Sequence, residues 1–326
     1  MTGAYIDNNY VYAVARIRSA ELKLLNKNAF EELLSAPSAN ALFAALKERG
    51  WGKDEDSTPD EMLSTERKRL WDFIEEIVPD MSVFDVFNAP NDYHNLKAAI
   101  KESVMEYDYP GIYIEEAKIS PALMAQAVKE RNFGMLPDEF SEVAHNALDT
   151  YLRTKDGQLC DCMVDRACLE AVLKAGKASG DAFLKEYAEL TAASVNIKIA
   201  VRSALTGKDR EFLSGALCEC ETLDKNALIN AALQGTDQIA SYLMTTDYQD
   251  AVPCLKKSMA AFENYRDDLI TRRTKDQQRE SFGLGPIAAY ILARENEIKS
   301  VRIIFSGKEN GFPDGMIRER VRETYV

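Results

Sequence analysis

Few residues in this 326-residue sequence interrupt regular secondary structure, since it has only 16 glycines and 10 prolines. Both counts lie below average usage, which favours long regular elements and excludes a loop-rich all-β fold. Disorder is excluded as well, because 46% of the residues are hydrophobic and can bury a sizeable core. The length allows two or three compact units or one repeat array.

The sequence also lacks an excess of positive charge. Its 40 lysine and arginine residues face 53 aspartate and glutamate residues, so the net charge is −13 and the pI is near 4.9. A surface this acidic repels polyphosphate chains, and we therefore expect no nucleic-acid partner.

Long hydrophobic runs are missing too. The longest apolar run, residues 286–293, is far too short to cross a bilayer. Residues 1–12 have neither the basic region nor the apolar core of a secretion signal. We therefore expect no direct membrane span and a cytoplasmic protein that reaches a membrane only through a partner.

The six cysteines do not form a recognisable disulfide framework or zinc motif. They are Cys160, Cys162, Cys168, Cys218, Cys220 and Cys254. Two pairs have a C-x-C spacing, which differs from the usual C-x₂₋₄-C of zinc sites and points the two side chains to different faces of a helix. Without a secretion signal, reduced thiols are the favoured interpretation.

Other catalytic and metal-binding motifs are also absent. No GxxxxGK[ST] sequence is present, so the chain has no P-loop for nucleotide hydrolysis. We interpret His94 as a packing or hydrogen-bonding residue and not as a general base, and His145 has no recognisable partner. Asp267-Asp268 lacks a third carboxylate at the spacing of a metal-binding helix, since Thr271 follows. The sequence therefore predicts no catalytic residue, no cofactor site and no metal site.

Helix signals, by contrast, are dense. Residues 58–61 (Thr-Pro-Asp-Glu) form a capping box with proline at the first helical position, and the helix they begin should end before Pro79. A second apolar stripe with helical period begins at Phe140 and breaks at residues 156–157. A third begins after residues 180–181 and ends near Gly207. No stretch alternates as a strand would, and the predicted fold class is all-α.

An internal repeat is the most informative feature of the sequence. Asn-Leu-Lys, Asn-Ile-Lys and Glu-Ile-Lys each lie late in an expected helix and end at lysines 101 residues apart: Lys97, Lys198 and Lys299. Residues 45–52 (ALKERGWG) also resemble residues 127–134 (AVKERNFG), and a weaker third version ends in Tyr248. Two independent markers favour a triplication over chance recurrence.

The triplication predicts three similar helical repeats, at residues 1–112, 113–208 and 209–326. Three such units joined by short links suggest a funnel or cone with a pseudo-threefold axis. The repeated lysines could face a central depression, or pair with carboxylates within their own units, and we favour the structural role. The repeated aromatic side chains are most simply core anchors: Trp51, Phe133 and Tyr248.

Charge is distributed unevenly along the chain. Residues 52–80 contain ten acidic and four basic residues. Basic residues gather in the third expected repeat: Lys256, Lys257, Arg266, Arg272, Arg273, Lys275 and Arg279. These segments are either ordinary solvated helix faces or opposite poles that orient the protein between two partners.

Four segments carry a resemblance to a known family. They are residues 12–18 (YAVARIR) followed by Glu21 and Leu24-Leu25, residues 84–87 (FDVF), residues 91–97 (NDYHNLK) and residues 317–325 (IRERVRETY). Because these segments occur in the same order and are spread along the chain, the chain resembles the C subunits of prokaryotic V-type (A/V-type) ATPases. These are relatives of the d subunits of eukaryotic V-ATPases. The middle of the chain, residues 121–208, carries only the generic helical pattern.

The resemblance implies a non-catalytic rotor subunit on the cytoplasmic face of the membrane. Such a subunit stands between the D and F subunits of the central stalk and the membrane proteolipid ring, and contacts the catalytic A/B head only indirectly. It would couple ATP turnover to proton or sodium transport. Two alternatives from other classes are a stand-alone helical-repeat adaptor outside any ATPase, and a metal-dependent helical enzyme that uses the Cys or Asp pairs.

Overall fold

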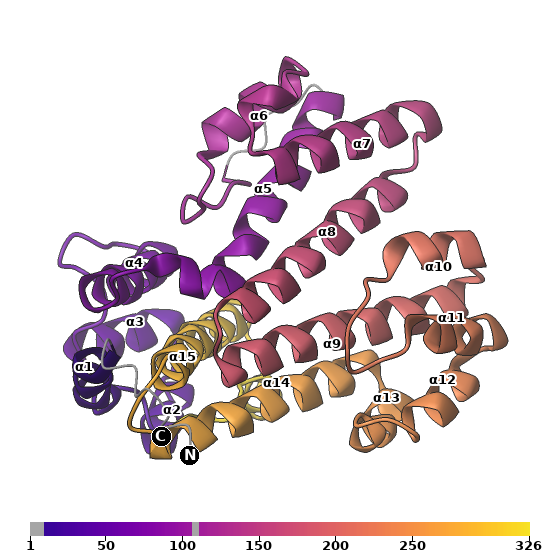
Figure 1. The fold of residues 1–326 in the computed structure, drawn as a ribbon. Helices are drawn as coiled ribbons and strands as arrows, with labels where there is room; N and C mark the ends of the chain where they lie inside the picture. Colours follow the sequence, from indigo (N-terminus) through magenta and orange to yellow (C-terminus); the bar gives the residue numbers. More distant parts are fainter. Residues whose placement is uncertain (1–9, 106–110) are drawn as a thin grey trace, which may run out of the picture. The chain divides into compact units, whose positions relative to one another are not determined.

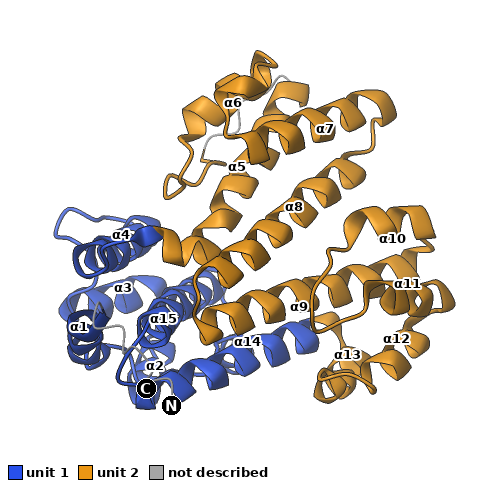
Figure 2. Cartoon of the chain, in the orientation of Figure 1, with its two compact units in different colours: residues 1–81, 260–326 blue, residues 82–259 orange. Residues whose placement is uncertain are grey.

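The computed structural model describes residues 10–105 and 111–326, and every regular element in these ranges is helical (Figure 1). The predicted all-α class is confirmed. Figure 2 shows that the chain divides into two compact units. Unit 1 combines both ends of the chain, Met1–Met81 with Ala260–Val326, whereas unit 2 is the continuous segment Ser82–Met259.

Unit 1 brings N-terminal and C-terminal helices into one core. Its elements are α1 (Val11–Glu21), α2 (Lys27–Leu34), α3 (Ala39–Glu48), α4 (Pro59–Ile77), α14 (Met259–Asp276), η5 (Gln277–Arg279), α15 (Gly285–Glu309) and α16 (Asp314–Arg318). The long helix α15 packs against α1, α3, α4 and α16. Its buried face, with Ile298, Val301 and Ile304, completes a hydrophobic core begun by Leu33 and Leu42 on the N-terminal helices.

The N-terminal helices of unit 1 begin at side chains that satisfy free backbone amides. Asn26 and Ser38 accept hydrogen bonds from the third residues of α2 and α3. α4 begins with the predicted capping box, in which Thr58 and Glu61 exchange side-chain and backbone bonds, and it ends at Ile77, before Pro79.

Unit 2 is built around two long helices. Its elements are η2 (Met81–Phe84, beginning at the last residue of the first segment of unit 1), α5 (Asp85–Met105), α6 (Pro121–Lys129), η3 (Phe133–Met135), α7 (Asp138–Thr154), α8 (Gly157–Ala178), α9 (Ala182–Thr206), α10 (Arg210–Ala216), α11 (Lys225–Gln234), α12 (Thr236–Leu243), η4 (Gln249–Ala251) and α13 (Val252–Lys257). α8 packs against α5, α7 and α9, and α9 packs against α11 and α12. Asp156 and Asp181 cap the starts of α8 and α9.

Three buried polar side chains, which we call braces, each fix a loop to a long helix by hydrogen bonds to the loop backbone. The Asn95 amide on α5 donates to the Ile114 carbonyl and accepts from the Ile114 amide, both at 2.9 Å. The Asn196 amide on α9 makes the same pair of bonds with Cys218, at 2.9 and 3.1 Å. The Glu297 carboxylate on α15 accepts from the Leu25 amide. Each bond holds the loop before a short helix: α6, α11 or α2.

The predicted helix boundaries agree closely with the structure. The helix expected from Phe140 is α7, which begins two residues earlier and ends with Lys155 in the left-handed conformation. The helix expected after residues 180–181 is α9, ending at Gly207, whose φ is +66°. Within residues 10–105 and 111–326, no helix is both long and apolar enough to cross a membrane. The repeat boundaries at 112 and 208 stay predictions.

Candidate functional site

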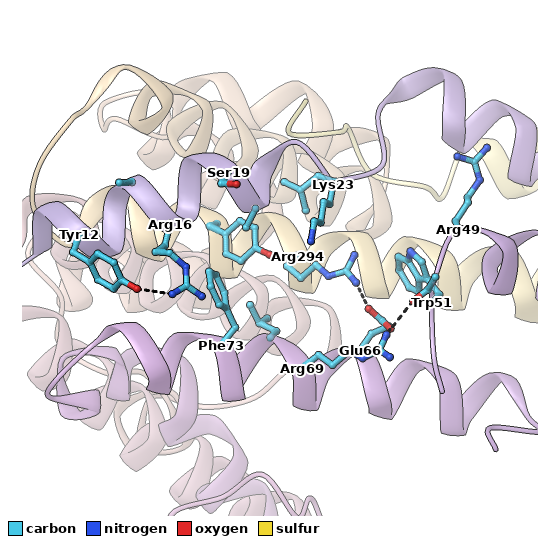
Figure 3. A pocket seen from close by; sticks show the side chains of 16 residues that line it. Tyr12, Arg16, Ser19, Lys23, Arg49, Trp51, Glu66, Arg69, Phe73 and Arg294 are labelled. Atoms are coloured by element: carbon cyan, nitrogen blue, oxygen red, sulfur yellow. Dashed lines mark hydrogen bonds and ion pairs between the residues drawn. The ribbon is translucent and has the colours of Figure 1, made fainter. Parts of the chain in front are cut away.

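A cavity of about 610 Å³ lies within unit 1. Its walls come from α1, α4 and α15 and from the turn that follows α3 (Figure 3). The lining side chains are mainly basic or aromatic: Tyr12, Arg16, Lys23, Arg49, Trp51, Arg69, Phe73, Tyr290 and Arg294, with Glu66 as the acidic member. Five cationic side chains thus line a cavity in a protein whose net charge is −13.

An ion-pair network centred on the buried side chains of Glu66 and Arg294 forms the inner wall of the cavity, and the side chain of Arg69, its third member, is 45% exposed. The Glu66 carboxylate is only 4% exposed; it accepts from the Gly52 amide at 2.7 Å and from Arg69 at 2.7 Å, and it pairs with Arg294. Arg294 also pairs with Glu297 and lies over the Trp51 ring, 4.5 Å from its centroid. Burial lowers the pKa of the Arg294 guanidinium, while the Glu66 carboxylate opposes that effect.

The turn after α3 is shaped to meet this network. Arg69 donates to the carbonyls of Gly50 and Gly52, at 3.0 and 2.8 Å. Gly52 has a φ of +71°, and a Cβ atom there would lie 2.8 Å from the Asp56 carboxylate. Glycine is therefore required for the turn that places Trp51 beneath Arg294.

At the rim of the cavity, the arginines pair with carboxylates that are far more exposed than Glu66. Arg16 donates to the Tyr12 hydroxyl at 2.6 Å and to Glu76 at 3.0 Å, and it lies 5.4 Å from the Phe73 ring centroid. Arg49 pairs with the exposed Glu32 at the other end. Figure 3 shows Lys23, in the turn that follows α1, between these two ends.

This arrangement suits binding better than acid–base chemistry. The Glu66 carboxylate in the lining already pairs with two guanidiniums and accepts from the Gly52 amide, so its oxygens are engaged in the fold. Cations and aromatic faces together are the groups that recognise an anion attached to an apolar body. Elsewhere, among the residues that the structure describes, no cluster of three His, Cys, Asp or Glu side chains could hold a metal ion.

Two of the three repeated lysines pair with carboxylates, but only Lys299 has its partner within its own predicted repeat; the partner of Lys97 lies in residues 113–208. Lys97 on α5 pairs with Asp165 on α8, and Lys299 on α15 pairs with Asp267 on α14 at 3.3 Å. Lys198 lies on α9, partly buried.

The repeated aromatic side chains differ in burial. Trp51 and Tyr248 are both 4% exposed, and the Tyr248 hydroxyl bonds Thr222 at 2.8 Å. Phe133 is only partly buried at the edge of the unit 2 core, where it meets the His145 ring edge-on. The prediction of core anchors is therefore confirmed for Trp51 and Tyr248, whereas Phe133 packs at the margin.

The histidines and cysteines have packing roles. His94 Nε2 makes a hydrogen bond of 2.9 Å with the Ile112 carbonyl. All six cysteines are unpaired, and burial raises the pKa of the Cys160 thiol to about 11 and that of Cys218 to about 12. Thiols with such values carry little thiolate at neutral pH and are poor nucleophiles.

The Asp267-Asp268 pair belongs to an ion-pair cluster. The Asp267 side chain is 10% exposed and binds Arg266 on its own helix, Lys299 on α15 and Arg322 in the C-terminal segment. Although burial raises the pKa of Asp267, these cations outweigh that effect and hold it below its usual value. Asp267 therefore attaches the C-terminal segment to α14 and α15.

The polar residues of segment 91–97, one of the four that carry the family resemblance, also hold the backbone in place. In residues 91–97, Asn91 donates to the Glu116 carbonyl at 2.6 Å, and Asp92 accepts from the Ile119 amide at 2.8 Å. Together with His94 and Asn95 they hold the chain between residues 112 and 119. The motif thus specifies a fold.

Sequence reasoning missed the cavity. Its lining comes from three stretches far apart in the chain, residues 12–24, 49–73 and 290–294, and no single motif spans them. Tyr12 and Arg16 lie in one of the resembling segments, but nothing in the sequence pairs them with Arg294. The cavity forms only because α15 packs against the N-terminal helices, and no local sequence pattern indicates that long-range contact.

Comparison with known proteins places nearly the whole chain in one family. The profile of the ATP synthase (C/AC39) subunit family matches residues 13–320. The C subunit of a V-type sodium ATPase from Enterococcus hirae is 23% identical, over 95% of this chain and 97% of its own length. The C subunit of an A-type ATP synthase from Methanocaldococcus jannaschii is 25% identical, over 94% and 84%. That of a V-type ATP synthase from Thermus thermophilus is 21% identical, over 96% and 98%.

These matches confirm the resemblance and extend it through the middle of the chain, where the sequence motifs were weakest. C subunits are accessory subunits of their complexes and do not themselves catalyse nucleotide hydrolysis, so the chain is not an enzyme. The chain belongs to the ATP synthase (C/AC39) subunit family.

Proposed function

We propose that this protein is the rotor-coupling subunit of a V/A-type ATPase. In this role it joins the D and F subunits of the central stalk to the membrane proteolipid ring and transmits torque during ATP-linked proton or sodium transport. It contacts the A/B head indirectly and lies on the cytoplasmic face of the membrane. The match to C subunits over almost the entire chain is the observation that carries the proposal.

The packing of the helices supports a torque-transmitting role. A coupler must resist twisting, and close-packed helices with buried polar braces are stiff. Asn95, Asn196 and Glu297 each fix a loop to a long helix. In unit 1 the brace joins a C-terminal helix to an N-terminal loop, so both ends of the chain are held in one body.

The same three braces support the proposed triplication and the pseudo-threefold funnel. Each comes shortly before a repeated lysine in the sequence, and each fixes the loop before a short helix. A pseudo-threefold cone would adapt one central shaft to a ring of different symmetry. The repeats at residues 1–112, 113–208 and 209–326 are part of this proposal.

Deletion and add-back of the protein test the function. We expect membranes from a strain lacking this protein to lose ATP-driven ion uptake into vesicles, while the detached head still hydrolyses ATP. Adding the purified protein should restore uptake and recover the D and F subunits and the proteolipid in one detergent-solubilised complex. Uptake that is unaffected by the deletion would contradict the proposal and favour an adaptor outside the ATPase.

A further inference from the structure

We propose that the cationic cavity of unit 1 is a docking site for an acidic polypeptide segment of a neighbouring subunit. The segment would place aspartate or glutamate side chains beside Lys23, Arg16 and Arg49, with its apolar side chains against the aromatic wall. This inference rests on the proposed function, because the segment belongs to another part of the same complex.

The charges at the cavity are divided between an inner wall and a rim. At the inner wall, Glu66 neutralises part of the charge of Arg69 and Arg294, and Arg69 also donates to two backbone carbonyls. These two guanidiniums are already engaged in the fold. The cations open to a ligand are therefore those of the rim: Arg16, Lys23 and Arg49.

The rim cations can exchange their present partners. Glu76, the partner of Arg16, is 61% exposed, and Glu32, the partner of Arg49, is 67% exposed. Ion pairs this exposed contribute little to stability, so a ligand carboxylate can replace them at small cost. Lys23 is exposed, lines the cavity and has no ion pair with any residue in the described ranges.

The spacing of the rim cations favours a polypeptide over a single phosphate group. Arg16 and Lys23 are seven residues apart on α1 and just after it, which corresponds to roughly 10 Å along a helix axis. Carboxylates on successive turns of a helix or along an extended segment can reach both, whereas one phosphate cannot. A small polyphosphate would need clustered free guanidiniums, but those at the inner wall are already bonded.

Aromatic side chains complete the recognition surface. Tyr12, 62% exposed, lies at one end of the cavity, and Phe73 and Tyr290 pack edge-on with ring centroids 6.0 Å apart. An amphipathic acidic segment can bury its apolar side chains on these rings. The rim cations then speed its approach and fix its register.

Charge reversal at Lys23 tests the docking site, with Lys27→Glu as matched control. Lys27 is an exposed lysine at the start of α2 and does not line the cavity. The ligand is the purified ATPase complex that lacks this protein. We expect Lys23→Glu to weaken binding of the full chain about tenfold, an effect reduced by high salt, and Lys27→Glu to leave it unchanged.

A second variant and a cross-linking experiment test the same docking site independently. Ser19→Glu adds a carboxylate to the cavity without removing a cation, and it should weaken binding as well. A zero-length carbodiimide reagent should join the Lys23 amine to an aspartate or glutamate of another subunit, as identified by mass spectrometry. Circular dichroism confirms that each variant is folded.

The possible failures are distinguishable. If wild-type protein does not bind the complex, the proposed function fails. If it binds but Lys23→Glu and Ser19→Glu bind equally well, the docking site is wrong and the function stands. The rate at which Lys23 is acetylated reports whether a ligand covers it. If ATP slows this acetylation in the isolated chain, and assembly into the complex does not slow it, the cavity is a small-anion site and the inference is overturned.

Discussion

Arg294 is the residue on which the packing of unit 1 most directly depends. Its guanidinium pairs with Glu66 and Glu297, whose side chains are each 4% exposed, and it covers the Trp51 ring. Arg294→Met keeps the aliphatic stem but leaves two buried carboxylates without this partner. We expect the free energy of unfolding, measured in urea by circular dichroism, to fall by about 3–5 kcal/mol.

Arg302→Met is the matched control on the same helix. Arg302 pairs with Asp60 at 3.6 Å, and the two side chains are 53% and 86% exposed. Its loss should lower stability by about 1 kcal/mol or less, because the pair is exposed to solvent. Equal effects of the two substitutions would show that the buried network does not stabilise unit 1.

At the scale of elements, α8 and α9 pack so closely that one glycine is required. A Cβ atom on Gly176 of α8 would lie 2.6 Å from the Ala188 Cβ atom of α9 and 3.1 Å from the Leu184 carbonyl. We expect Gly176→Ala to lower the free energy of unfolding by about 1–3 kcal/mol, because the two helices must separate. Thermal unfolding followed at 222 nm measures the change.

Gly215→Ala in α10 is the corresponding control, since no heavy atom lies within 4 Å of the added methyl group. Alanine favours the helix over glycine, so this change should stabilise the protein by about 0.5–1 kcal/mol. A gain of the same size at Gly176 would contradict the close packing of α8 and α9.

Asp267 holds three elements together, and its contribution should depend on pH. Its pKa lies below the ordinary value because Arg266, Lys299 and Arg322 outweigh the effect of burial. A lowered folded-state pKa stabilises the protein above the unfolded pKa, and this stability is lost as pH falls through the folded value. Asp267→Asn should therefore cost about 3 kcal/mol at pH 7 and progressively less below about pH 4.

The neighbouring Asp268 should affect the pH dependence of stability in the opposite direction. Burial and Glu323 raise its pKa, so its ionisation destabilises the folded state as pH rises above the unfolded value. Asp268→Asn should gain stability relative to wild type between about pH 4 and pH 7. Urea unfolding of both variants across this range provides the measurement, and parallel pH profiles would refute the assignment.

At the scale of the whole molecule, local sequence patterns predicted individual helices but not the contacts between helices that are far apart in the chain. The capping box at residues 58–61 and the glycine at 207 set the bounds of α4 and α9, because caps act within one turn of a helix. Residues 91–97 are one of the four segments that carry the family resemblance, and in the structure their polar groups hold a loop. The cavity could not be predicted, since it requires α15 to pack against helices more than 200 residues earlier.

That contact predicts unequal behaviour of the two units when they are separated. Unit 2 is one continuous segment, so residues 82–259 should be helical and unfold cooperatively when expressed alone. Residues 1–81 should lack cooperative unfolding, because Leu33, Leu42 and Leu46 pack in a core completed by Ile298 and Ile304 of α15.

Co-expression of residues 1–81 with residues 260–326 should restore that core. We expect the untagged fragment to co-purify with its tagged partner and helical circular dichroism to exceed the sum of the separate fragments. Substituting Ile298→Asp in the C-terminal fragment should abolish co-purification, because it places a charge at a fully buried position. Cooperative unfolding of residues 1–81 alone would show that the core of unit 1 forms without the C-terminal helices. The hydrogen bond from the Leu25 amide to Glu297 would then not be needed to form that core.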